Sequence, residues 1–592
     1  MDRFYKGMRA ISLIAGTLLL PSIMPAADYV LEEAVKPEVE SFWNKDVKTS
    51  FRLMSKIGKV NVMTPKTENP APVPSAADRD LGFIPFERSY LLMTSYNYSP
   101  VEAERRIGGL KIAAAPGRYE SFALGIYPLQ TSQLTVTASD LSGNGAVIPA
   151  ANIETGFLLH LLKTVSFQQQ EVRPEMINKG NTGDIYKGVT RTLWFTIKVP
   201  EGAPAGVYQG TLTVTAGKKP FTEKISFEVL PVKLLEDCDF PTGWFGMPLD
   251  DETLQFAIEH GSNSVDSGLE PKMTYAGGKI SLDFSGPKKR AEQLRKFGLE
   301  KYRHQIFLME YASGLMHTYN LKEFSPEFNK AFKEINAQLV KWFAENKLRV
   351  VFFVVDEPRE DASAYQNRNY ADTVKYVKLC QEVPGVITMV TPMADEHFGR
   401  DYTGFCDILD ILSTHSYEYS SKMLNKCKNG AKAELWLYNS GRNRLSFGFN
   451  PWKWKAKGRR EWAFAWGWTE TVSKDFLSWS TYGGGDPACG VLYPAANGPQ
   501  STPSLDKARE GTDDMKYIYT LECKIAAAKN SGNPEAVAAA GRAGQFLKAL
   551  EQKIPEYSRL VATADTGNSG HELEEWRYGI AQEIIRLDKV LK

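Results

Sequence analysis

Hydrophobic and polar positions follow two different periods along the chain. Between about Ser89 and Leu230, apolar and polar residues alternate in short runs separated by Gly, Pro and Asn. This alternation predicts half-buried strands and, with turn residues between them, an N-terminal antiparallel β-sandwich. The clearest predicted strands are Glu120–Leu129, Ser132–Leu141, Arg191–Pro200, Val207–Ala216 and Glu223–Val232.

From about Phe240 the pattern changes to apolar runs that alternate with amphipathic helical stretches. Nearly continuous apolar strands are typical of a parallel sheet covered on both faces. Eight such runs within about 230 residues predict a central (β/α)8 barrel of the TIM type, a fold that typically has ~250 residues. The runs are Gly243–Pro248, Ser262–Gly268, His304–Tyr311, Arg349–Pro358, Gly385–Pro392, Asp407–Tyr417, Ala433–Ser440 and Glu461–Trp468.

The end of the chain has 3.6-residue periodicity with Gly, Asn and Pro breaks, which predicts a C-terminal helical segment packed on the barrel. The fold class is therefore multi-domain α/β. We expect a signal peptide at 1–27, the β-sandwich domain at 28–236, the barrel at 237–500 and the helical region at 501–592.

The first 27 residues have the features of a secretory signal. Arg3, Lys6 and Arg9 precede the apolar run Ile11–Leu20, and small residues follow at Ala26 and Ala27. The run is too short to span a bilayer, so we expect a secreted or periplasmic protein without stable membrane insertion.

The charge balance and the spacing of cysteines and histidines indicate which partners and cofactors are not expected. The chain has 71 Lys and Arg against 70 Asp and Glu, with no long block of like charge, which removes the electrostatic reason to expect a nucleic-acid partner. The six Cys form no CxxC motif, and the seven His form no HExxH motif. We therefore expect no metal and no cofactor, and at most one disulfide, whose pairing the sequence does not assign.

The strongest chemical signal is "FFVVDEP", in which an apolar run leads into Asp356 and Glu357. Catalytic groups of barrels lie at the carboxyl ends of strands, and these two residues end the fourth predicted strand. Neighbouring carboxyl groups push their pKa values apart, so one can serve as an acid while the other stays charged. Such a pair suits glycoside hydrolysis. In the alternative interpretation, Asp356 caps the next helix and Glu357 forms a surface ion pair. The position of both residues at the end of the fourth predicted strand makes this alternative weaker.

A second carboxylate is expected at the end of the seventh strand in many retaining glycosidases. Here Glu434 stands at the start of that strand and Asn439 at its tip. This absence favours substrate-assisted catalysis, in which the 2-acetamido oxygen of the substrate attacks the anomeric carbon. Asp356 would then orient the acetamido group and Glu357 would act as acid and base. Glu396 and Glu418 remain rival nucleophiles.

The chain resembles glycoside hydrolase family 123 in three places: "WFTIKVPEGAPAGVYQGTLTV" in the sandwich, "VVDEP" in the barrel, and "VLYPAANGPQSTPSLDKAREGTDDMKYIY" in the tail. Its "REGTDD" segment (Arg509–Asp514) resembles the family's hallmark before the C-terminal helices. The resemblance implies a retaining, exo-acting β-N-acetylgalactosaminidase with Asp356 and Glu357 as its Asp–Glu pair. The substrate would be a glycan or glycolipid with a terminal 2-acetamido sugar.

Further polar and aromatic residues at predicted strand ends are candidates for substrate binding, because sugars bind to flat aromatic faces and to hydrogen-bonding groups. They are Trp244, Tyr311, His415, Tyr417, Tyr438, Asn439, Trp466 and Trp468. Two other interpretations remain open: a different glycosidase with Glu396 or Glu418 as nucleophile, or a non-catalytic carbohydrate-binding surface protein.

Overall fold

The computed structural model describes most of the chain in two compact units. Described are residues 29–31, 61–65, 69–105, 107–166, 169–236, 238–247, 250–358, 368–392, 401–416, 420–465, 490–493, 498–556 and 571–591. One unit lies within residues 1–236, 466–553 and 564–592, and the other within 237–465 and 554–563. Among the described residues, no helix has both the length and the apolar character needed to cross a membrane.

The first unit contains two β-sheets that face each other. One sheet has the order β1-β2-β10-β9-β12-β5-β3 and the other the order β11-β6-β13-β14-β4. The first sheet comprises β1 (Tyr29–Leu31), β2 (Asn61–Pro65), β3 (Phe83–Glu87), β5 (Tyr119–Pro128), β9 (Ile153–Ser166), β10 (Gln169–Lys179) and β12 (Arg191–Lys198). The second comprises β4 (Leu110–Ala114), β6 (Ser132–Ala138), β11 (Thr182–Ile185), β13 (Gly206–Thr215) and β14 (Phe221–Val229), with β7 (Leu141–Gly143) and β8 (Ala146–Ile148) beside it.

The alternating pattern explains this sandwich. Inward residues of both sheets form one apolar core, which includes Leu124 and Phe195 of the first sheet and Val136, Leu212 and Phe227 of the second. All five strands predicted from the alternation are present, with ends that differ by at most three residues. The sequence pattern does not predict the long β9–β10 pair, whose strand β9 contains adjacent apolar residues in "FLLHLL".

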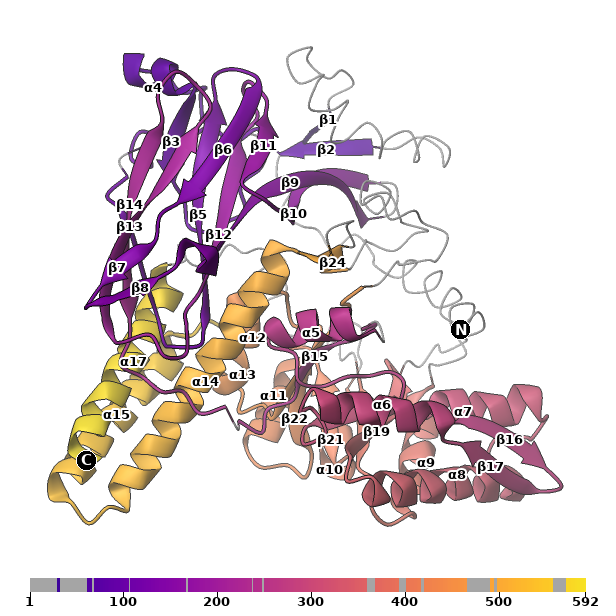
Figure 1. The fold of residues 1–592 in the computed structure, drawn as a ribbon. Helices are drawn as coiled ribbons and strands as arrows, with labels where there is room; N and C mark the ends of the chain where they lie inside the picture. Colours follow the sequence, from indigo (N-terminus) through magenta and orange to yellow (C-terminus); the bar gives the residue numbers. More distant parts are fainter. Residues whose placement is uncertain are drawn as a thin grey trace. The chain divides into compact units, whose positions relative to one another are not determined.

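Three C-terminal helices belong to the same unit as the sandwich (Figure 1). They are α14 (Pro503–Lys529), α15 (Pro534–Lys553) and α17 (His571–Leu591). They contact one another, and α14 contacts β5 of the sandwich. The packing of these helices on the barrel stays a prediction. The contacts between α14 and the sandwich are made by buried charges, whose partners hydrophobic periodicity does not identify.

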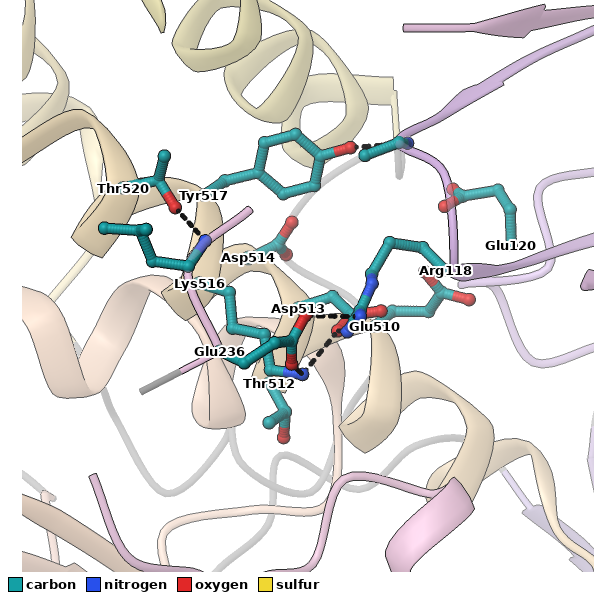
Figure 2. Close-up of polar contacts among 12 residues, drawn as sticks. Arg118, Glu120, Glu236, Glu510, Thr512, Asp513, Asp514, Lys516, Tyr517 and Thr520 are labelled. Atoms are coloured by element: carbon teal, nitrogen blue, oxygen red, sulfur yellow. Dashed lines mark hydrogen bonds and ion pairs between the residues drawn. The ribbon is translucent and has the colours of Figure 1, made fainter. Parts of the chain in front are cut away.

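The hallmark segment Arg509–Asp514 lies in α14 and supplies most of these charges. Glu510, Asp513 and Asp514 are at most 5% exposed. Glu510 accepts a hydrogen bond from the backbone N–H of Ser121 in β5 (3.0 Å), and Arg118 pairs with Asp513 (3.3 Å; Figure 2). This segment therefore joins the helices to the sandwich.

Arg577 of α17 completes the joint from the other side. Its guanidinium donates to Glu510 (3.1 Å), Asp514 (2.5 Å) and Glu120 of β5. Burial by itself would lower the pKa of Arg577, but the three carboxylates outweigh it and raise the pKa well above its ordinary value. The guanidinium thus stays charged in a buried position where unpaired carboxylates would be costly.

The second unit is built on seven parallel strands in the order β15-β23-β22-β21-β20-β19-β18. They are β15 (Thr242–Trp244), β18 (Arg303–Phe307), β19 (Arg349–Asp356), β20 (Thr388–Thr391), β21 (Ile411–Thr414), β22 (Glu434–Tyr438) and β23 (Gly458–Glu461). Helices follow most strands: α5 (Asp251–Glu259), α6 (Ser285–Lys296), α7 (Met309–Ser313), α8 (Pro326–Glu345), α9 (Tyr370–Gln381), α10 (Phe405–Ile408), α11 (Ser421–Lys428), α12 (Arg444–Phe447) and α13 (Phe449–Lys453). A hairpin of β16 (Lys272–Ala276) and β17 (Lys279–Asp283) lies against α8.

The second predicted strand, Ser262–Gly268, is not a regular strand. It still links the two edge strands, because Asn263 donates its backbone N–H to Thr242 of β15 (2.9 Å) and Val265 accepts from Gln305 of β18 (3.0 Å). The carbonyls of Ser264 and Val265 also accept hydrogen bonds from the Arg460 side chain at 3.1 and 2.9 Å. The Arg460 guanidinium thus replaces some of the backbone hydrogen bonds that a regular strand would make to its neighbours.

The eighth predicted strand begins earlier than the sequence suggests. β23 is the polar segment Gly458–Glu461, whose four residues are all buried. The Arg459 guanidinium donates to the carbonyls of Ser446 (3.1 Å) and Gly441 (2.6 Å), so its buried N–H groups have acceptors. From the hydrophobic pattern alone, a charged residue such as Arg459 is expected outside the core. An apolar run therefore does not identify this strand.

Candidate active site

Asp356 and Glu357 are both hydrogen-bonded to the side-chain hydroxyl of Thr391. Asp356 is the last residue of β19, and Thr391 is the last of the neighbouring β20. The Thr391 hydroxyl donates to Asp356 Oδ1 (2.7 Å) and accepts from the backbone N–H of Glu357 (3.1 Å). Because one hydroxyl serves both residues, the orientation of the Asp356 carboxylate is coupled to the path of the chain at Glu357.

The backbone turns sharply at this point. Val351–Val355 are buried in the middle of β19, so the strand is held on both faces. Glu357 then has φ 39°, a left-handed conformation that is uncommon for residues other than Gly. Side chains of successive strand residues point to opposite faces, and a turn at Glu357 ends that alternation directly after Asp356. Both side chains are partly exposed.

Aromatic rings from several strands pack together beside this strand. Phe245, which follows β15, lies 6.1 Å from Phe353 of β19 and 6.0 Å from Phe307 of β18, measured between ring centroids. It also lies 5.4 Å from Tyr438 of β22 and 6.2 Å from Trp462, which follows β23. These residues belong to one apolar cluster. The cluster gives the carboxyl half of the sheet a rigid aromatic base.

The end of β22 is fixed by hydrogen bonds to neighbouring segments. Asn439 has φ 45°, and its Oδ1 accepts from the backbone N–H of Trp462 (2.8 Å). Its carbonyl lies 3.1 Å from His415 Nδ1, and the His415 ring packs edge-on against Tyr438. Asn439 and His415, both predicted to bind substrate, therefore hold strand ends together in this structure.

Trp244 and Tyr311, also predicted to bind substrate, are buried. Trp244 is 1% exposed and stacks on Phe447 at 5.2 Å. Tyr311 is 4% exposed, and its hydroxyl donates to the carbonyl of Pro271 (3.2 Å). Tyr438, at 5% exposure, lies within the aromatic cluster described above. These three rings contribute packing, whereas a stacking platform for a sugar needs an exposed face.

The remaining predicted residues lie outside the described residues: Tyr417, Trp466 and Trp468, together with the rival nucleophiles Glu396 and Glu418. Trp462, which the sequence reasoning passed over, is the partly exposed tryptophan that directly follows β23. Thr391 was missed as well. Its position at the end of the fifth predicted strand was a signal, but a single hydroxyl carries little information without its partners.

Two further acids at strand ends have perturbed pKa values. Loss of solvation raises the pKa of Glu310, which begins α7 after β18, to about 7. Burial, reinforced by Glu310, raises the pKa of Glu270 to about 8. Glu270 Oε1 is buried without a hydrogen-bond partner among the described residues. A carboxyl group that holds its proton at neutral pH is a candidate general acid.

Other carboxylates near strand ends are neutralised. Glu434, at the start of β22, pairs with Arg303 (2.7 Å) and accepts from Trp436 Nε1 (2.8 Å). Glu461 ends β23 and accepts from Arg459, while burial raises its pKa. Within the described part of the chain, no group of three or more His, Cys, Asp or Glu residues is arranged to hold a metal ion.

Comparisons with known proteins agree with the sequence resemblance. Residues 126–216 match the glycoside hydrolase 123 N-terminal domain. A solved structure of a family 123 glycoside hydrolase from Clostridium perfringens, described in terms of glycolipid glycan hydrolysis, is similar with a TM-score of 0.59 and 15% identity. The similarity covers 86% of this chain and 98% of that chain.

A GH10 xylanase with a bacterial Ig-like domain from termite gut is 11% identical over 69% of this chain and 100% of that chain, but its TM-score of 0.32 carries no argument. No match is found among curated proteins. The fold and the domain match support a glycoside hydrolase. More particularly, residues 126–216 are similar to the N-terminal domain of glycoside hydrolase family 123, and the fold is similar to that of a solved member of that family.

Proposed function

We propose that the chain is a retaining, exo-acting glycoside hydrolase that removes terminal β-linked N-acetylgalactosamine by substrate-assisted catalysis. The observation that carries this proposal is the Asp356–Glu357 pair, fixed by Thr391 at the carboxyl end of β19. In the proposed architecture, the seven parallel strands close as a (β/α)8 barrel, with Ser262–Gly268 in the place of the second strand. The hydrogen bonds from this segment to β15 and β18 support closure.

In the first step, the Glu357 carboxyl group protonates the glycosidic oxygen while the substrate's acetamido oxygen attacks the anomeric carbon. The bond to the leaving group breaks, and a cyclic oxazolinium forms. The Asp356 carboxylate accepts a hydrogen bond from the acetamido N–H and stabilises the positive charge of the oxazolinium as it develops. The hydroxyl of Thr391 keeps that carboxylate oriented.

In the second step, the Glu357 carboxylate removes a proton from water, which attacks the anomeric carbon and opens the ring. Two inversions give overall retention of configuration. Two carboxylates are poorly placed as nucleophiles: Glu461, at the end of β23, is paired with Arg459, and Glu434 is paired with Arg303 at the start of β22. Both observations support a nucleophile that comes from the substrate. Glu396 and Glu418 are the competing nucleophiles.

The proposed substrate is a glycan or glycolipid that ends in a 2-acetamido sugar. The Clostridium perfringens neighbour, described in terms of glycolipid glycan hydrolysis, supports this class. An extracellular or periplasmic site of action, as expected from residues 1–27, would bring the enzyme into contact with such glycans.

A panel of aryl β-glycosides that differ only at C2 and C4 tests the proposal. We expect hydrolysis of the 2-acetamido galactoside and none of the 2-hydroxy analogue, because a site that uses a polar group rejects substrates without it. Efficient hydrolysis of the plain galactoside, or a 2-fluoro sugar trapped on Glu396 or Glu418, would contradict substrate assistance. Glycan binding without any hydrolysis would support the non-catalytic alternative.

Glu310→Gln is the matched comparison for Glu357→Gln, because Glu310 is the other partly exposed acid at a neighbouring strand end. If Glu357 is the acid, only its variant loses activity on substrates with poor leaving groups, and azide restores its turnover of activated aryl glycosides. The reverse pattern would assign the acid role to Glu310.

A further inference from the structure

Two cysteines of the second unit, Cys406 and Cys427, have their sulfur atoms close together. Cys406 lies in α10 and Cys427 in the last turn of α11, and their sulfur atoms are 3.6 Å apart. Cys406 is fully buried, whereas Cys427 is partly exposed. Both are free thiols in this structure. This separation is close to the contact distance of two sulfur atoms, so nothing stands between them.

The surrounding contacts hold the two helices in this arrangement. Lys426, next to Cys427, donates to the Thr403 carbonyl (3.2 Å) and pairs with Asp407 (2.6 Å), on either side of Cys406. The Cys406 carbonyl accepts from the backbone N–H of Ala433 (2.9 Å), which anchors α10 to the start of β22. These three contacts hold α10 against α11 and against the start of β22, and so they position both thiols.

We propose that Cys406 and Cys427 form a disulfide when the chain enters an oxidising compartment. A disulfide bond is ~2.05 Å long, so the sulfur atoms must approach by about 1.5 Å. Rotation of the partly exposed Cys427 side chain supplies such a movement most easily, because Cys406 is enclosed.

The oxidant is a dithiol–disulfide exchange protein or a small disulfide such as oxidised glutathione. The Cys427 thiolate attacks one sulfur of the oxidant, which releases the other sulfur as a thiolate. Cys406 then attacks the Cys427 sulfur and displaces the oxidant's first sulfur. One S–S bond forms in the protein, one breaks in the oxidant, and two protons and two electrons leave the cysteine pair.

The electrostatics suit Cys406 for the second attack. In the reduced protein, the S–H of Cys427 is hydrogen-bonded to Cys406 and lowers the pKa of the Cys406 thiol, and Lys426 acts in the same direction. Once Cys427 is held in the mixed disulfide, its S–H is gone, and Lys426 is the group that still favours the Cys406 thiolate. The cross-link would enclose the chain from Asp407 to Lys426, which includes β21 and His415. Since His415 contacts Asn439 at the end of β22, the cross-link would also restrain this part of the candidate site.

Peptide mapping of the full-length protein tests the inference. The protein is incubated with oxidised glutathione under native conditions, alkylated without reduction, and digested. We expect a linked peptide pair that contains Cys406 and Cys427. Recovery of both residues as separate alkylated peptides would overturn the proposal, and this readout needs no variant.

Thermal unfolding gives a second measurement. Oxidised wild type should unfold at a temperature about 5–10 °C higher than the reduced protein. Cys406→Ser and Cys427→Ser should each remove this redox dependence, whereas Cys523→Ser, a control on α14, should retain it. A redox-dependent shift that survives in Cys406→Ser or Cys427→Ser would contradict this pairing.

Discussion

Arg577 provides the sharpest test of how the helical region is held to the sandwich. Its guanidinium contacts the carboxylates of Glu120, Glu510 and Asp514, and all four residues are at most 4% exposed. Replacement by Met keeps much of the side-chain volume but removes the charge and every donor. Removing one partner of a buried ion pair costs about 3–5 kcal/mol, because the other charge stays buried without compensation.

Arg577→Met leaves three carboxylates in this position, so we expect a loss of at least ~4 kcal/mol from the unfolding free energy of the sandwich unit. A second substitution, Glu510→Gln, removes one of the uncompensated charges and should restore part of the loss. Such non-additivity is expected only of residues that interact directly.

The matched control is Arg586→Met on the same helix. Arg586 pairs with Glu583 one turn away, but its side chain is 63% exposed, so water and salt screen the pair. We expect a change below ~0.5 kcal/mol. Denaturant unfolding should be followed for each unit, because a chain of two units need not unfold in one step. Hydrogen exchange in α17 then shows whether the loss is local. An Arg577→Met effect no larger than that of Arg586→Met would refute the reasoning.

The other predictions concern catalysis and pH. Glu357→Gln should slow turnover of natural glycosides by ~10²–10⁴-fold with an unchanged melting temperature, and wild-type activity would remove Glu357 from the acid role. Asp356→Asn should lower kcat more than it raises KM for 2-acetamido substrates, since its charge acts as the oxazolinium forms; an effect on KM alone would argue for simple binding. Thr391→Val should lower kcat while Thr391→Ser retains it, and equal losses would exclude positioning by the hydroxyl. The raised pKa values of Glu270 (about 8) and Glu310 (about 7) mean that the folded state keeps protons that the unfolded state releases near pH 4.5. Stability should therefore fall as pH rises from about 5 to 8, and Glu270→Gln should raise the melting temperature at pH 8.5 by about 2–4 °C but not at pH 5; a pH-independent effect would contradict this assignment.

The sequence predicts those parts of the fold in which one face of each element is apolar. The sandwich strands alternate because water lies on one side of each sheet, and β19 is continuously apolar because helices and core enclose it. Asp356 and Glu357 are visible for the same reason, since two charges directly after a buried run stand out. Their link through Thr391 depends on the neighbouring strand and has no local signature.

Prediction fails where buried charge replaces apolar contact. The hydrophobic pattern does not indicate β23, because its residues Arg459 and Arg460 are charged, although in the structure both are fully buried and bind backbone carbonyls. The hallmark segment in α14 is strongly charged in sequence, yet its carboxylates are buried and meet arginines that are distant in sequence. The periodicity of hydrophobic residues describes one position after another along the chain. It contains no information about which charged side chains, distant in sequence, will form ion pairs.

The end of β22 connects the architecture with the proposed mechanism. In many retaining glycosidases a carboxylate nucleophile stands at the end of the seventh strand, and in the (β/α)8 barrel that we propose this would be the position of Asn439. Here the Asn439 side chain is bound to the backbone N–H of Trp462 and holds the end of β23 in place. A longer, charged Glu would have to give up that contact to reach a substrate. The position thus has a structural role, and in the mechanism that we propose the nucleophile is the neighbouring 2-acetamido group of the substrate, which needs no further protein residue.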